Sequence, residues 1–321
     1  MGAQSAGGGD HPPSQPDDVE GGRRQPPEVA YGGQFGDTVR ARLETGFFAR
    51  LVPGLLEQAG GGRLLDLGCG DGLAARVAGP ALTEYTGVDF REGVAPGQSQ
   101  PPGEHVLHDL RDGFGPVGDV PFDVYLATFG VISHLQPSQF ERLLREIAAH
   151  ARPGSVIALE ALGLGSLEWP GLWDTSPGPR RSLPYRLGSD VAVHPWSKRE
   201  LWALHREAGL RPVGVLDRSV QAGPKTGEGR YWPGLPPLRR ALDDLLEGHG
   251  EEQARGVLGH PLPPLPAGPA AAVHHALSLR RQRLAAGRGG TPAGLARAVW
   301  ALEARSGGGF GHGLTVIARK P

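Results

Sequence analysis

Three glycines at alternate positions, Gly68, Gly70 and Gly72, constrain this chain more than any other feature of its sequence. A short buried strand is predicted before them, over Arg63–Leu67, and a helix after them, over Leu73–Val77. Glycine lets the backbone turn sharply and approach a ligand closely. The start of the helix offers free N–H groups and a positive dipole end. The sequence therefore predicts a ligand-binding turn at the end of a strand.

Strands and helices alternate on both sides of this turn. Strands are predicted over 63–67, 85–90, 105–110, 122–129, 155–162, 213–216 and 314–318. Capping boxes predict helix starts at Ser138 with Glu141 and at Ser197 with Glu200. This alternation favours an α/β fold: a doubly wound, mainly parallel seven-stranded sheet that is covered on both faces.

The chain divides into four predicted segments. Residues 1–28 are polar and rich in glycine and proline, which is typical of a disordered tail. Residues 29–59 form an N-terminal helical lid, whose helical run is expected to break at Pro53. Residues 60–219 and 309–321 form the cofactor-binding domain. Residues 220–308 form a helical insertion before the last strand, with helices near 237–247, 269–286 and 292–304, and we interpret it as a substrate cap.

Composition excludes several classes of protein. The formal net charge of -1 disfavours a globally basic nucleic-acid binder. The single cysteine, Cys69, excludes an intrachain disulfide framework and a Cys-rich metal site, and we expect no metal. No apolar run approaches the length of a membrane span, and no signal peptide is visible. We expect a cytoplasmic protein with no membrane or nucleic-acid partner; the oligomeric state stays open.

Two acidic residues narrow the classes of ligand that the turn could bind. Asp89 lies 21 residues after Gly68, at the end of the next strand, where nucleotide-binding sheets carry the residue that binds ribose hydroxyls. The dinucleotide fingerprint requires a glycine at the position of Leu73. Asp66 would repel a pyrophosphate but attract an ammonium group. The turn therefore suits a cofactor that joins adenosine to a zwitterionic amino acid, and a nicotinamide-dependent oxidoreductase is disfavoured.

The stretch Asp66-Leu67-Gly68-Cys69-Gly70-Asp71-Gly72 resembles the first motif of class I S-adenosylmethionine-dependent methyltransferases. The agreement continues along about half of the chain, at Thr86-Gly87-Val88-Asp89, His108-Asp109-Leu110, Phe122-Asp123-Val124 through Ser133-His134, and 143–156 with Arg152-Pro153-Gly154. The resemblance implies a Rossmann-like methyltransferase fold and S-adenosylmethionine as the cofactor.

The resemblance also implies roles for single residues. Gly68, Gly70 and Gly72 would line the methionine and ribose part of the cofactor, and Asp66 would hold its amino group. Asp89 would bind the ribose hydroxyls, with Phe90 beside it. Asp109 would accept from the adenine amino group, with Leu110 beside the ring and Thr128 at the fourth strand end. In the N-terminal segment, Tyr31 would lie near the sulfonium and Arg40 would bind the carboxylate, for which Arg42 is an equal candidate by residue type.

The predicted function is methyl transfer to an oxygen or nitrogen of a small-molecule acceptor. His134 is the candidate general base, because histidine titrates near neutral pH. Two alternatives stay open: a catalytically silent cofactor-binding scaffold, and a nucleic-acid base methyltransferase. The second would favour an Asn/Asp-Pro-Pro-aromatic motif where this chain has Ala127-Thr128-Phe129-Gly130. Five aromatic residues are expected either to wall an acceptor pocket or to pack the cap: Trp169, Trp173, Tyr185, Trp196 and Trp232.

Overall fold

The computed structural model describes residues 38–90, 103–175, 183–186, 190–221, 232–287, 289–303 and 307–321. The predicted tail, 1–28, and Tyr31 lie outside the described residues.

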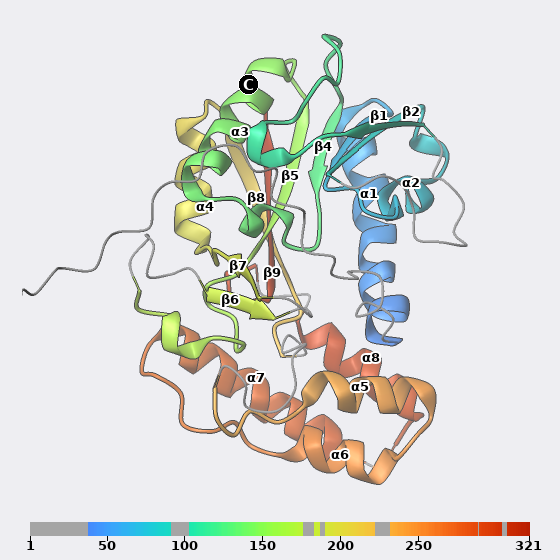
Figure 1. The fold of residues 1–321 in the computed structure, drawn as a ribbon. Coiled ribbons are helices and arrows are strands. Elements are labelled where there is room, and N and C mark those ends of the chain that lie inside the picture. Colours follow the sequence, from blue (N-terminus) through green and yellow to red (C-terminus); the bar gives the residue numbers. More distant parts are fainter. Residues whose placement is uncertain are drawn as a thin grey trace, which may run out of the picture.

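Seven of the described strands form one sheet in the order β3-β2-β1-β4-β5-β9-β8 (Figure 1). Their bounds are β1 Arg63–Leu67, β2 Glu84–Asp89, β3 Glu104–Leu107, β4 Val124–Ala127, β5 Val156–Leu162, β8 Arg211–Arg218 and β9 Gly313–Arg319. Within this sheet β9 runs antiparallel to the other six strands, through its pairs with β5 and β8. The predicted fold class, a doubly wound and mainly parallel seven-stranded sheet, is confirmed.

Each central strand buries side chains on both faces, in two separate cores. Leu64 in β1 packs with Val124 in β4 under α1 (Thr45–Ala59) and α2 (Leu73–Val77). The neighbouring Leu65 points to the other core, under α3 (Pro137–His150) and α4 (Lys198–Glu207). Strand side chains alternate between faces, so a nearly continuous apolar run is what a sheet covered on both faces requires.

Several boundaries differ from the sequence prediction. Helix α1 continues through Pro53 to Ala59, because the helix packs firmly against the sheet through residues on both sides of the proline. Helix α3 begins at Pro137 rather than at Ser138, and its box pairs the Gln136 N–H with the Gln139 side chain at 2.8 Å. Proline suits this first position because its ring presets φ and the helix needs no N–H there. The box of Ser197 and Glu200 at α4 is as predicted.

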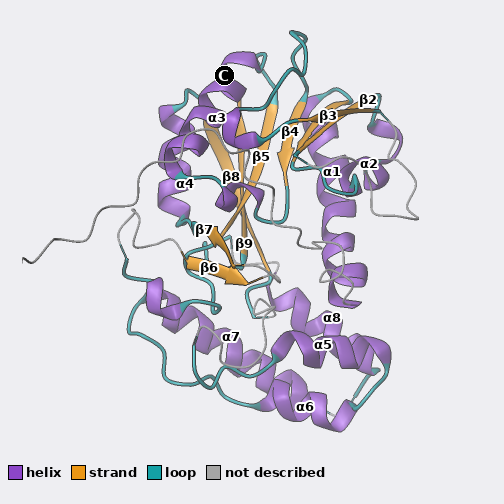
Figure 2. Ribbon diagram, in the orientation of Figure 1, coloured by secondary structure: helices purple, strands orange, loops and turns teal. Residues whose placement is uncertain are grey.

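The insertion consists of helices that lie across the carboxyl-terminal edge of the sheet (Figure 2). They are α5 Leu238–Glu247, α6 Glu251–Gly259, α7 Pro269–Ala286 and α8 Pro292–Glu303. Sequence reasoning missed α6, and it also missed the hairpin of β6 (Leu183–Arg186) and β7 (Asp190–Val193). Val39 and Leu43, from the N-terminal segment, share one apolar cluster with α5, α6 and α8.

His274 fastens α7 to the rest of the molecule. It is fully buried, its Nε2 donates to the Gly165 carbonyl at 2.8 Å, and its ring stacks on Trp173 with centroids 5.5 Å apart. Burial lowers its pKa to about 4, so the imidazole is neutral at pH 7.

Because His274 is neutral in the folded protein, a fall in pH should destabilise the folded protein. The unfolded chain takes up this proton near pH 6.5 and the folded protein only near pH 4, so stability is full above pH 6.5 and is lost as the pH falls. From 1.36 kcal/mol per pKa unit, this group accounts for a loss of about 2 kcal/mol between pH 7 and pH 5. Urea unfolding of His274→Gln should show a pH dependence smaller by about that amount. The exposed neighbour supplies the control, His275→Gln, and an unchanged pH dependence in His274→Gln would contradict the expectation.

Candidate functional site

The glycine turn after β1 has backbone φ angles that glycine adopts readily and that other residues rarely adopt. Gly68, Gly70 and Gly72 have φ of 70°, 51° and 70°, all in the left-handed region. A side chain at Gly68 would lie 2.6 Å from the Val131 side chain, whereas the space beside Gly70 is open. The Gly70 N–H donates to Asp89 Oδ2 at 2.9 Å, so the carboxylate at the end of β2 fixes the turn directly. The structure thus brings these four predicted residues together.

Asp66 is buried directly before this turn, with 2% of its surface exposed. The Tyr85 hydroxyl donates to its Oδ2 at 3.0 Å, while its Oδ1 has no hydrogen-bond partner among the described residues. Burial, aided by the nearby charges of Asp89 and Asp71, raises the pKa of Asp66 to about 7. A buried carboxylate oxygen without a donor costs free energy, and a cationic group placed beside it would offset that cost.

Asp109 lies outside the strand that was predicted over 105–110, because β3 stops at Leu107. It caps a short 3-10 helix, accepts from the Arg111 backbone N–H at 2.9 Å, and also binds the Arg111 guanidinium. Burial raises its pKa, but the hydrogen bonds from Arg111 outweigh burial and leave the pKa below its ordinary value. An adenine amino group at Asp109 would have to share the carboxylate with Arg111.

The other predicted cofactor contacts differ in their exposure to solvent. Leu110 is buried in the 3-10 helix, Phe90 is 42% exposed at the end of β2, and Thr128 is half-buried after β4. Asp89 ends β2, and Phe90 and Thr128 directly follow β2 and β4, so all three lie at the carboxyl-terminal edge of the sheet, where ligands bind in folds of this class.

Sequence reasoning missed Phe129, the residue after Thr128. Its φ is 55°, which is an outlier for a bulky side chain. The Arg40 guanidinium lies 3.7 Å above its ring, and Phe48 packs against it with centroids 4.7 Å apart. Such strain costs about 1–3 kcal/mol and is concentrated at functional sites. No pattern in the sequence signals a left-handed phenylalanine, although its place after β4 marks the edge to inspect.

Arg40 comes from η1 (Arg40–Glu44), a π-helical turn that leads into α1. Burial lowers its pKa to about 10, and the nearby Glu44 and Asp71 oppose that shift. Asp71 belongs to the glycine turn, so Arg40 is near this turn as well as near the Phe129 ring at the end of β4. π-helical turns are rare in proteins, and those that occur often lie at functional sites.

His134, the predicted base, ends a 3-10 helix (Val131–His134) after β4. Burial lowers its pKa to about 4, so at pH 7 the imidazole is neutral but only weakly basic. No group of three or more His, Cys, Asp or Glu within the described ranges is arranged to hold a metal ion. Among the described helices, none combines the length and the apolar character that crossing a bilayer requires.

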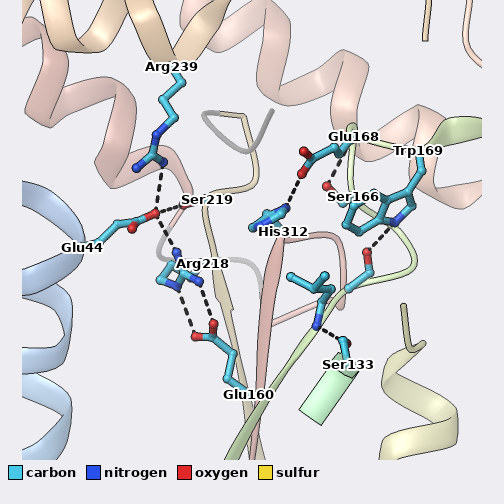
Figure 3. Close-up of polar contacts among 12 residues, drawn as sticks. Glu44, Ser133, Glu160, Ser166, Glu168, Trp169, Arg218, Ser219, Arg239 and His312 are labelled. Carbon is cyan, nitrogen blue, oxygen red and sulfur yellow. Dashed lines mark hydrogen bonds and ion pairs between the residues drawn. The ribbon is translucent and has the colours of Figure 1, made fainter. Parts of the chain in front are cut away.

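A buried ionic network joins the N-terminal segment, the sheet and the insertion (Figure 3). Arg218, at the end of β8, donates to both oxygens of Glu160 at 2.6 and 3.1 Å and to Glu44 Oε1 at 2.6 Å. Arg239 of α5 reaches the same oxygen of Glu44 at 3.1 Å. A charge inside an apolar strand, as at Glu160, was a signal in the sequence that a buried partner must exist.

Figure 3 also shows a second buried pair, in which His312 Nδ1 lies 2.5 Å from Glu168 Oε2. Trp169, beside it, donates to the Gly163 carbonyl at 3.0 Å. Trp196 packs on Phe140 in the sheet core, as Trp173 packs on His274. For these tryptophans the packing interpretation is therefore the better supported; the side chain of Tyr185 lies outside the described residues.

Comparison with known proteins identifies one protein family. The model of a family described as "Methyltransferase domain" matches residues 40–215, which is more than half of the chain. No curated protein matches the sequence.

Three solved structures show the level of structural similarity. The sugar N-methyltransferase KedS8 from Streptoalloteichus is 19% identical, over 55% of this chain and 83% of that chain, with a TM-score of 0.40. The Burkholderia thailandensis 1,6-didemethyltoxoflavin-N1-methyltransferase is 21% identical, over 52% and 69%, with a TM-score of 0.38. The [4+2]-cyclase SpnF is 19% identical, over 85% and 81%, with a TM-score of 0.42. Likeness this weak says nothing about a substrate.

The geometry of Asp66 predicts an unusual titration in the ligand-free protein. One carboxyl group should titrate near pH 7, because burial disfavours its charged form. Carbon-detected NMR of the aspartate carboxyl groups from pH 4 to pH 9 would show this transition, and it should be missing from Asp66→Asn. If every carboxyl group titrated below pH 5, the burial of Asp66 would not be as described.

Proposed function

Since the chain belongs to the class I family of S-adenosylmethionine-dependent methyltransferases, whose methyl donor is its cofactor, we propose that it is an enzyme that methylates an oxygen or nitrogen of a small-molecule acceptor. One observation supports this proposal most: the unpartnered carboxylate oxygen of Asp66 is buried beside a turn of three left-handed glycines. That arrangement fits a ligand that brings a cation and needs close approach to the backbone.

The residues of the turn would hold the cofactor as follows. Asp66 would bind the ammonium group, and Asp89 would bind the ribose hydroxyls while it holds Gly70. The open space beside Gly70 would admit the ligand to the backbone. Arg40 would bind the carboxylate, because a guanidinium binds a carboxylate with two hydrogen bonds. Asp109, Leu110, Phe90 and Thr128 would surround the adenosine, as the sequence motifs imply.

When bound, the cofactor supplies a methyl group attached to a sulfonium sulfur. The neutral thioether that remains after the transfer is a good leaving group. The protein's own contribution is then mostly alignment of the acceptor with that methyl group. The carboxyl-terminal edge of β4, at Thr128 and Phe129, lies beside the proposed cofactor position. We propose that the insertion, 220–308, covers this edge as a cap and that 29–59 acts as a lid.

The weak basicity of His134 bears on the choice of acceptor. A neutral amine attacks without prior loss of a proton, whereas a phenol or alcohol needs a base with a pKa near the working pH. His134 would be a poor base for the second group of acceptors, because its pKa is about 4. This favours a neutral amine among the proposed acceptors, with His134 as a hydrogen-bonding partner.

The weak basicity of His134 also fits one other candidate function, a scaffold that binds the cofactor without turnover. The described residues at the end of β4 include no strongly basic histidine. Detection of methylated product from any amine in a metabolite screen with labelled cofactor would exclude it. The near-neutral formal charge gives no support to nucleic acid as the acceptor.

Asp89→Ala should bind S-adenosylhomocysteine at least tenfold more weakly than the native protein. The substitution removes a charged acceptor from the ligand and also releases the Gly70 N–H, and each charged hydrogen bond contributes about 1.5–3 kcal/mol. Isothermal titration calorimetry at pH 7.5 measures the loss. Asp119→Ala, at an exposed loop residue, is the control. Equal affinities for Asp89→Ala and the native protein would contradict the proposed site.

The affinity for S-adenosylhomocysteine should fall as the pH drops below 7. The ligand's ammonium group binds the ionised form of Asp66. Because the pKa of Asp66 is about 7, the ionised fraction falls about tenfold for each pH unit well below 7. Calorimetry at pH 7.5, 6.5 and 5.5 would follow the change. Asp66→Asn should bind weakly with a flat profile over this range; parallel profiles for the two proteins would rule Asp66 out as the source.

A further inference from the structure

A single oxygen atom joins three parts of the chain. Glu44 Oε1 accepts from Arg218 of β8 at 2.6 Å, from Arg239 of α5 at 3.1 Å and from the Ser219 hydroxyl at 3.2 Å (Figure 3). Glu44 itself belongs to η1 of the N-terminal segment. All three charged side chains are at least nine-tenths buried, so each interaction is shielded from solvent. The N-terminal helix, the sheet and the insertion therefore meet at one carboxylate.

Helix α5 also contacts η1 and the residue before it. The Val39 N–H donates to Asp243 Oδ1 at 2.7 Å, and the Arg42 guanidinium donates to the Leu246 carbonyl at 2.7 Å. Val39 and Leu43 pack into the apolar cluster of α5, α6 and α8. These contacts make the start of the N-terminal helix and α5 a single packed unit.

The other end of this unit reaches the carboxyl-terminal edge of the sheet, at the end of β4. Arg40 begins the turn that Glu44 ends, and its guanidinium lies 3.7 Å above the strained Phe129 ring at the end of β4. The Arg218 guanidinium lies 5.1 Å from the same ring. A shift of Glu44 would therefore move Arg40 relative to both Phe129 and the glycine turn.

Arg40 lies in a cluster of largely buried charges. Glu160 and Glu44 are held by Arg218, and Arg239 adds a further guanidinium at Glu44. The carboxylates of Glu44 and Asp71 and the guanidinium groups of Arg218 and Arg239 all act electrostatically on Arg40. A guanidinium binds a carboxylate with two hydrogen bonds, and low polarity strengthens that attraction.

We propose that Arg239 and Glu44 are positioning residues that couple the helical insertion to the cofactor site. Arg239 holds Glu44, Glu44 sets the turn that carries Arg40, and Arg40 binds the carboxylate of the cofactor. Docking of α5 and binding of the cofactor then strengthen each other, by linkage. The inference rests on the proposed function, since it requires the cofactor beside Arg40.

The test compares two adjacent arginines on α5. Arg239 is buried on Glu44, whereas Arg240 is exposed. Arg239→Met should bind S-adenosylhomocysteine about tenfold more weakly than the native protein, and Arg240→Met should bind it equally well. Calorimetry is done at a temperature where both variants are folded by circular dichroism. Arg239→Lys, which keeps a cation within reach of Glu44, should recover most of the affinity.

A loss of thermal stability in Arg239→Met without any change of affinity would overturn the proposal, because a purely structural role predicts that result. Hydrogen exchange of the native protein provides a measurement that needs no variant. Addition of S-adenosylhomocysteine should slow exchange in α5 as well as in 38–59 and the glycine turn. Protection confined to the glycine turn would also overturn the proposal.

The two proposals fail in different ways. If the native protein showed no binding of S-adenosylhomocysteine, the proposed cofactor site itself would be wrong. If the native protein bound it and Asp89→Ala did not, while Arg239→Met bound it normally, the cofactor site would stand and only the coupling would be rejected.

Discussion

The buried guanidinium of Arg218 is the interaction on which the arrangement of the segments depends. Burial alone would lower its pKa, but Glu160 and Glu44 outweigh burial and hold the pKa above its ordinary value. A buried ion pair adds little net stability compared with apolar residues, yet loss of one partner costs about 3–5 kcal/mol. The network therefore contributes to specificity: other placements of η1 or β8 would leave a buried charge without its partner.

This constraint explains why the N-terminal helix and the insertion belong to the candidate site. Both lie far in sequence from β4, and both meet Arg218 or Glu44 at the carboxyl-terminal edge of the sheet. The edge of a doubly wound sheet positions ligands by itself. Here the chain adds charged side chains from outside the sheet, and these bring Arg40 over Phe129.

The sequence predicted the features that local patterns determine. The strands, the glycine turn and the box at Ser197 follow from alternation of buried residues, from φ preferences and from capping, which are all properties of a few consecutive residues. Pro53 was misjudged because tertiary packing keeps the helix intact around it. The ion pairs were out of reach because Glu44 and Arg218 are 174 residues apart. The left-handed Phe129 results from contacts with Phe48 and Arg40, which are equally remote in the chain. The roles of the candidate site residues stay predictions.

Strand order has a consequence for how the sheet is completed. β9 lies between β5 and β8, and β8 pairs with no other strand of the described sheet. The chain reaches β9 only after the whole insertion, so β8 has no partner during synthesis until the helices of the insertion have emerged. Pairings over such separations form slowly and leave strand edges exposed in the meantime. A nascent chain that stalls within the insertion would therefore present the edges of both β5 and β8 to other chains, which makes that stage the most vulnerable to aggregation.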